Sequence, residues 1–101
     1  MTVFRQRQLP AAYAHAAQGG QALHLLAGSF AYLRRDTPRC FRGHRQIAHL
    51  FDQDKERLIA TARRLGVRVI RVEREATHRQ HIDLCGQPLE RAIAEANPDG
   101  R

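Results

Sequence analysis

The segment from residue 46 to residue 72 limits the fold more than any other part of the chain, because its apolar residues change period twice. Residues 46–51 alternate between two faces, which predicts a strand with His49 on one of them. Asp52 and Asp54 follow at once, and either can accept hydrogen bonds from the first N–H groups of a helix. The segment is therefore expected to begin as a strand that leads directly into a helix.

Residues 55–65 are the helix that this pattern predicts. Their apolar side chains recur at helical spacing, and Gly66 supplies the left-handed stop. Residues 67–72 are rich in β-branched side chains, which indicates a second strand. Two strands that flank one helix favour a parallel pair with a right-handed crossover. A β-α-β unit is thus the expected centre of the fold.

Shorter elements are expected on both sides of this unit. Residues 2–5 are typical of a short edge strand, and residues 11–18 of an alanine-rich helix. Residues 21–34 contain two apolar runs around a Gly-Ser pair, so a hairpin and a continuous helix both remain open. Residues 81–85 are expected to be extended, and residues 88–96 to form a final helix with a buried stripe.

Length and composition indicate one small domain. The chain has 101 residues, of which 43% are hydrophobic and 27% are charged, which is ordinary for a soluble globular protein. We therefore expect a single α/β (α+β) domain over residues 1–101, with a short sheet around the β-α-β unit and two or three helices. Residues 1–45 are its variable N-terminal part, and residues 46–97 its β-α-β-loop-α core.

The expected compartment is the cytoplasm. No apolar run approaches the roughly 20 residues that cross a bilayer, and the N-terminus lacks the apolar region of a signal peptide. No membrane is therefore expected among the partners of the protein, and Cys40 and Cys85 are expected to be reduced thiols. The sequence leaves the oligomeric state open.

Positive charge is the strongest global signal. The chain carries 17 basic and 10 acidic residues, a net charge of +7, which favours encounters with nucleic acid or an acidic partner. Its densest basic region is interleaved with Tyr32 and Phe41, and arginine binds phosphates and stacked bases well. The candidate nucleic-acid-binding residues are Arg34, Arg35, Arg39, Arg42 and Arg45. A solvated basic loop would have the same composition.

Side chains that suit catalysis gather in the middle and late parts of the chain. On an extended segment His81 and Asp83 point the same way, because side chains alternate with period two. A carboxylate two residues from a histidine can orient it or share a cation with it. Together with His49 on the other strand, these two are the candidate catalytic residues, and a divalent metal is the candidate cofactor. The simpler alternative is that His81 and Asp83 satisfy local backbone groups.

Other chemistries have weaker support. Cys40 and His44, with His81 and Cys85, make four potential zinc ligands, but neither pair has a zinc-finger spacing. No glycine-rich phosphate loop is present. A serine nucleophile is nearly excluded, because the only serine, Ser29, lies in a predicted turn.

Residues 43–96 also resemble a known family. The matching features are Gly43-His44-Arg45, His49-Leu50, an aspartate-led helix ending at Arg64-Leu65-Gly66, and His81-Ile82-Asp83-Leu84 before the last helix. They are similar to the small bacterial and phage proteins grouped as domain of unknown function 4031, which have tyrosine where this chain has Ile82. The family's N-terminal Tyr-Val-Asp-Asp-like strand is missing here or corresponds to residues 2–5. The resemblance brings no established activity, but it implies that His49, His81 and Asp83 lie together in one site.

Two functions of different classes follow. The first is a non-catalytic module that binds nucleic acid or an acidic partner through its arginines, and net charge makes it the favoured one. The alternative is a small metal- or His/Asp-dependent hydrolase, such as a phosphodiesterase or nuclease, that uses His49, His81 and Asp83.

Overall fold

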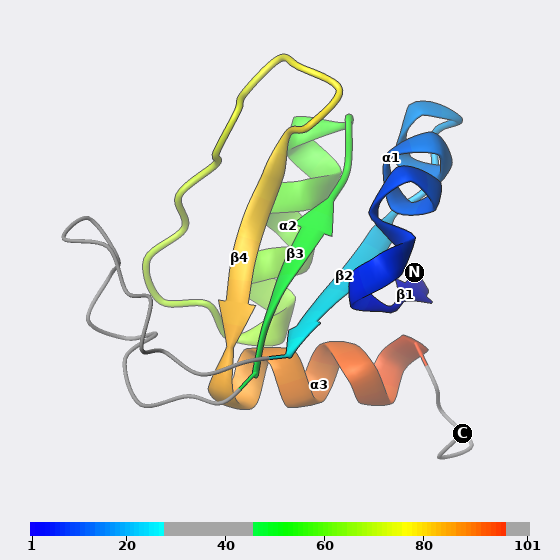
Figure 1. The fold of residues 1–101 in the computed structure, drawn as a ribbon. Coiled ribbons are helices and arrows are strands. Elements are labelled where there is room, and N and C mark those ends of the chain that lie inside the picture. Colours follow the sequence, from blue (N-terminus) through cyan, green and yellow to red (C-terminus); the bar gives the residue numbers. More distant parts are fainter. Residues whose placement is uncertain (28–45, 97–101) are drawn as a thin grey trace, which may run out of the picture.

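The computed structural model describes residues 1–27 and 46–96, which form a four-stranded mixed sheet with helices on both faces (Figure 1). The strands lie in chain order; β1 and β2 are parallel, and the other neighbouring pairs are antiparallel. The elements are β1 (Thr2–Phe4), the 3-10 helix η1 (Gln6–Gln8), α1 (Leu9–Ala17), β2 (Ala22–Ala27), β3 (Gln46–Phe51), α2 (Lys55–Leu65), β4 (His81–Cys85) and α3 (Gly86–Ala96). The α+β class and the single small domain are confirmed.

Two apolar clusters define the layers. The larger cluster lies between the sheet and the helices α2 and α3, and its buried members include Leu50, Leu58 and Leu84. The smaller cluster joins α1 to the opposite face of the sheet, where Ala16 and Phe51 are buried. Because side chains alternate along a strand, the consecutive residues of β3 contribute to different clusters. Helix α1 lies over the β1–β2 side of the sheet in Figure 1.

Helix α2 begins and ends where the sequence predicts. A side-chain oxygen of Asp54 accepts a hydrogen bond from the backbone N–H of Arg57 at 3.1 Å, which satisfies one of the unpaired donors of the first turn. Gly66 ends the helix with a left-handed φ of 90°. The strand predicted over residues 46–51 and the edge strand near the N-terminus are also confirmed.

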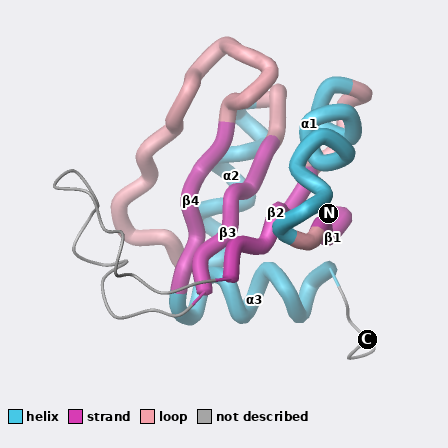
Figure 2. Tube along the Cα trace, in the orientation of Figure 1, coloured by secondary structure: helices cyan, strands magenta, loops and turns pink. Residues whose placement is uncertain are grey.

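The predicted parallel pair in the middle of the chain is wrong. Residues 67–72 form no strand, and β3 pairs antiparallel with β4 instead. The physical reason is that Val67, Ile70 and Val72 pack against the larger cluster as an irregular segment. Figure 2 shows this stretch as part of a long loop between α2 and β4. The loop brings the chain back beside the end of β3, where His81 pairs with Phe51. β4 therefore runs antiparallel to β3.

A parallel β-α-β crossover does exist, but at the N-terminus. It consists of β1, α1 and β2, with Thr2 opposite Ala22 in the register. Residues 22–27 are therefore strand, and the alternative of a continuous helix from residue 22 is wrong for them. Leu23 of β2 belongs to the larger cluster, so the core extends into the part of the chain treated above as a variable N-terminal part.

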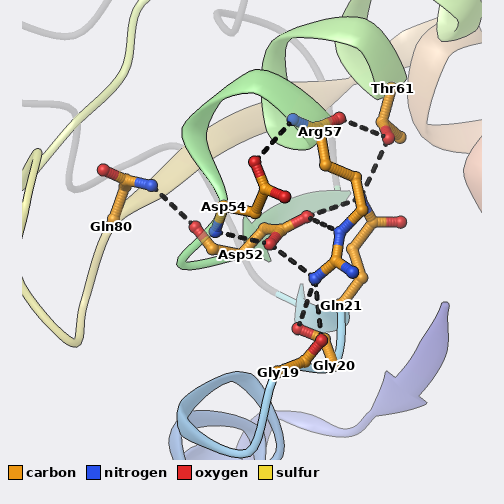
Figure 3. A network of polar contacts seen from close by, with 8 residues as sticks. All are labelled: Gly19, Gly20, Gln21, Asp52, Asp54, Arg57, Thr61 and Gln80. Atoms are coloured by element: carbon orange, nitrogen blue, oxygen red, sulfur yellow. Dashed lines mark hydrogen bonds and ion pairs between the residues drawn. The ribbon is translucent and has the colours of Figure 1, made fainter.

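A buried carboxylate connects α2 to the N-terminal half (Figure 3). Asp52 is 0% exposed, and its two oxygens each lie 2.7 Å from a guanidinium nitrogen of Arg57. Gln21 donates to Asp52 Oδ2 at 3.0 Å, and the backbone N–H of Asp54 donates to Oδ1 at 2.9 Å. The charge is thus paired in a bidentate manner and its remaining acceptor sites are used, as a buried carboxylate requires.

The same network reaches two further segments. Arg57 also donates to the carbonyl of Gly19 at 2.9 Å, beyond the end of α1. The side chain of Gln80 donates to the carbonyl of Asp52 at 2.8 Å, which holds the end of the long loop beside the end of β3. Within residues 1–27 and 46–96, no helix has the length and apolar content needed to span a membrane.

Candidate metal centre

Strand register brings three of the candidate residues to one face of the sheet. His49 on β3 lies directly opposite Asp83 on β4, and His81 lies opposite Phe51. Residues two apart on a strand share a face, so His81 and Asp83 point in the same direction as His49. The sequence predicted the shared face on β4, and the observed pairing of β3 with β4 brings His49 beside it.

The three side chains converge at one point. Nitrogen and oxygen atoms of His49, His81 and Asp83 that could bind a metal all lie within 4.8 Å of one another. Asp83 Oδ1 is 3.4 Å from Nε2 of His49 and 3.3 Å from Nε2 of His81. The three side chains are 27%, 14% and 31% exposed, respectively, so a ligand can reach them from solvent. We call these three residues the His–Asp cluster.

A backbone carbonyl fixes the orientation of His81. Its Nδ1 lies 2.7 Å from the carbonyl oxygen of Arg79, so Nδ1 carries a proton and donates it. Nε2 therefore faces Asp83. Histidines that bind metals commonly donate their second ring N–H to a carbonyl or carboxylate, which sets the tautomer and the ring orientation.

The two histidines of the cluster hold protons differently. Burial lowers the pKa of His49 to about 4, with His81 and His24 adding to the effect and Asp83 opposing it. Burial also acts to lower the pKa of His81, but contact with the Asp83 carboxylate and with the Arg79 carbonyl outweighs it, and the net pKa is raised. Near neutral pH, His49 is therefore unprotonated, whereas His81 holds its proton more firmly than an ordinary histidine.

A third histidine belongs to the same row, and the sequence did not indicate it. His24 on β2 lies opposite His49, is 2% exposed, and stacks on the His49 ring at 5.8 Å between centroids. Its Nε2 lies 3.0 Å from the carbonyl of Gln6. The one signal in the sequence was its alternation with Leu23 and Leu25, which identifies a face only once residues 22–27 are known to be a strand.

Three buried atoms in this row lack a well-aligned hydrogen bond. Among the residues that the structure describes, they are Nδ1 of His24, Nδ1 of His49 and Oδ1 of Asp83, of which Oδ1 still lies within ion-pair distance of both Nε2 atoms. Buried polar atoms are nearly always satisfied in folded proteins. Their concentration along one row of the sheet makes this region a candidate site for a ligand.

The donor set suits a divalent cation. Two imidazole nitrogens and one carboxylate oxygen are the ligands of many catalytic zinc and iron sites, which keep open positions for water and substrate. The opposite pKa shifts also allow acid–base chemistry, because one histidine can accept a proton while the other can donate one. Both uses place the chemistry at the same three residues.

The arginine group at residues 34–45, with Cys40 and His44, lies outside the described residues. Cys85 shares the face of His81 and Asp83, but the potential metal-ligand group found in the described part of the chain does not include it.

Comparison of the chain with protein-family models, with curated proteins and with solved structures finds no match. The resemblance to the domain of unknown function 4031 therefore stays a prediction.

Proposed function

We propose that the protein is a divalent-metal-dependent hydrolase of phosphate esters, with the His–Asp cluster as its metal ligands. The observation that supports this most directly is the approach of potential ligand atoms of all three residues to within 4.8 Å. Three protein ligands leave coordination positions for water and substrate, as in catalytic rather than structural sites. A divalent cation held there would polarise a phosphoryl oxygen and lower the pKa of a water ligand.

Each residue of the cluster has a defined task in this proposal. His49 binds without first losing a proton, because its pKa is about 4. His81 is presented by the Arg79 carbonyl and gives up its Nε2 proton on binding. Asp83, between the two histidines, supplies negative charge to a divalent cation. The resemblance to the domain of unknown function 4031 is consistent with this assignment, because it groups the same three residues.

Zinc and manganese are the first metals to test. Imidazole and carboxylate ligands suit zinc, iron and manganese, and the cluster contains no thiolate that would favour a structural zinc. The net charge of +7 favours an anionic substrate, because a field of that sign raises the local concentration of phosphate esters.

The test of this proposal is hydrolysis of p-nitrophenyl phosphate, a monoester, and of bis(p-nitrophenyl) phosphate, a diester, with zinc, manganese or iron added. We expect metal-dependent turnover that is lost in His81→Ala and in Asp83→Asn. His78→Ala is the matched control, because His78 is exposed and is not among the potential metal ligands in the described residues. Turnover that survives both cluster variants, or no turnover with any metal, would contradict the proposal.

A second candidate is a module that binds nucleic acid or an acidic partner without catalysis. Its specific support is that Arg68, Arg71 and Arg74 are exposed, and the structure records no ion pair for them among the described residues. In this reading Arg34, Arg35, Arg39, Arg42 and Arg45 supply further phosphate contacts. Affinity for DNA and RNA that stays undetectable at low ionic strength would remove this candidate, because phosphate contacts are strongest there.

A further inference from the structure

A groove separates the edge strand β4 from the segment that follows α2. Its volume is about 500 Å³, within the roughly 300–1,000 Å³ of small-molecule sites. β4 and the start of α3 form one wall, and residues between Gly66 and Glu73 form the other. Asp83 lines this groove and also belongs to the His–Asp cluster. A molecule in the groove therefore lies beside Asp83, one of the three proposed metal ligands. We call this the β4 groove.

The groove exists because a strand pairing begins and then stops. The N–H and C=O of His81 bond to Glu73 at 3.0 and 2.8 Å, and the same antiparallel register would place Arg71 opposite Asp83. The chain leaves the sheet before that point. Backbone groups of residues two apart on a strand point to the same side, so the N–H and C=O of Asp83 face the groove. They offer one donor and one acceptor to a ligand.

The opposite wall combines apolar surface with positive charge. Val69 is 80% exposed, the one large apolar side chain so exposed among the described residues. Arg68 and Arg71 flank it and line the same groove. Elsewhere in the described chain Lys55, Arg57 and Arg64 are paired with carboxylates, whereas no such pair is recorded there for Arg68 or Arg71. A small anion with an apolar part is the chemistry that this wall fits.

We propose that the β4 groove is the substrate-binding groove of the hydrolase, and that it takes an organic phosphate of the nucleoside monophosphate class. The apolar ring lies against Val69, and Arg68 and Arg71 bind the phosphate, since guanidinium groups match phosphate oxygens in geometry and charge. This inference rests on the proposed function for the reaction, but not for the binding itself. A peptide strand fits less well, because the bridge to Glu73 closes the pairing edge at His81.

The test is an amide-resolved NMR titration of the metal-free protein with adenosine monophosphate, adenosine and inorganic phosphate. We expect adenosine monophosphate to bind more tightly than either of its parts, with shifts at Val69, Arg71 and Asp83. Arg71→Ala should weaken its binding about tenfold, which corresponds to the loss of one charge-assisted hydrogen bond. The matched control Arg63→Ala, an exposed arginine on α2 outside the groove, should leave binding unchanged.

Three results would overturn the inference. They are an equal loss in Arg63→Ala and Arg71→Ala, shifts that map outside the groove, or adenosine monophosphate binding no more tightly than inorganic phosphate. The titration is repeated on His81→Ala to separate this inference from the proposed function. Retained groove binding together with absent metal uptake in the unmodified protein would overturn the hydrolase and keep the groove. Metal uptake without groove binding would keep the metal site and overturn the groove.

Discussion

His49 and His81 lie with ring centroids 4.7 Å apart, yet their protonation preferences are opposite. Burial acts to lower the pKa of both rings and prevails at His49. At His81 it is outweighed by the hydrogen bonds to the Asp83 carboxylate and the Arg79 carbonyl together with the charge of Asp83. Two measurable pH effects follow, one on metal binding and one on stability.

Metal binding should release a proton and weaken as pH falls. The pKa of His81 is raised above its ordinary value of 6.5, so near neutral pH more of the protein carries the proton that a metal must displace than with an ordinary histidine. We expect zinc affinity to fall as pH drops through the raised pKa of His81. Calorimetry in buffers of different ionisation enthalpy measures the released proton directly. Affinity that stays constant as the pH is lowered from above the ordinary histidine pKa of 6.5 to below it would contradict this.

The metal-free protein should lose stability on mild acidification through His49. The folded pKa of about 4 lies below the ordinary value of 6.5, so the unfolded chain takes up a proton in a range where the folded chain does not. The contribution of His49 to the unfolding free energy is therefore present above pH 6.5 and is lost as the pH falls toward 4. His81 acts in the opposite sense, since its raised pKa adds stability below 6.5 that is lost as pH rises.

Urea unfolding at two pH values isolates the His49 contribution. As the pH falls from about 7 to about 5, we expect the loss of the His49 contribution to lower the unfolding free energy by roughly 2 kcal/mol. His49→Gln removes this contribution and keeps His81. Over the same pH interval, the decrease in the unfolding free energy of this variant should therefore be smaller than the decrease in the unmodified protein by the contribution of His49. Identical pH dependence in the two proteins would show that His49 does not titrate between the two states as described.

At the scale of elements, the Asp52 network makes α2 and the N-terminal half depend on one another. Arg57→Ala leaves a fully buried carboxylate without its cation, although Gln21 and the Asp54 N–H still donate to it. We expect a loss of about 3 kcal/mol, since removing one partner of a buried pair leaves an uncompensated charge. Arg63→Ala on the same helix is exposed and should change stability by less than about 0.5 kcal/mol. Equal losses in denaturant unfolding would contradict the role of the network.

The end of α2 provides a second test at this scale. Gly66 has a φ of 90°, and a Cβ there would lie 2.5 Å from Nη1 of Arg91, which donates to the carbonyl of Leu65 at 3.2 Å. Gly66→Ala should cost about 1–2 kcal/mol, because alanine disfavours the left-handed region. Gly66→Asn should cost less, because asparagine visits that region more readily. An unchanged midpoint of thermal unfolding in Gly66→Ala would show that the helix end tolerates a different backbone.

Local signals predicted single elements better than their pairing. Alternation defined β3, and the aspartate cap with the glycine stop defined α2, since both patterns act within a few residues. The β-branched run at 67–72 misled because it reports a preference for extended backbone and carries no information about a partner strand. Whether that run joins the sheet depends on Val67, Ile70 and Val72 packing on the core, which is a property of the whole fold.

At the scale of the whole molecule, the sheet separates two tasks. One face carries α2, α3 and the larger apolar cluster. The other carries α1 at the side of β1 and β2, and the His–Asp cluster at the side of β3 and β4. Asp83, at the edge of the sheet, also lines the β4 groove, so the proposed metal ligands and the proposed substrate groove meet there.

The candidate site was partly predictable, because local spacing can be read from the sequence and strand pairing cannot. The spacing of His81 and Asp83 on one short segment was sufficient to place them on one face. The register between β3 and β4 was needed to bring His49 opposite Asp83, and the register between β2 and β3 was needed to reveal His24. Register between strands far apart in the chain is set by the packing of the whole domain, so a single sequence does not reveal it.

The most direct test of the proposed metal centre is a native mass spectrum of the untagged protein with zinc or manganese added. We expect one bound metal per chain, lost in His81→Ala and in Asp83→Asn and retained in His78→Ala. A spectrum that shows only the metal-free mass at every metal concentration would contradict it. So would a bound metal that both cluster variants retain.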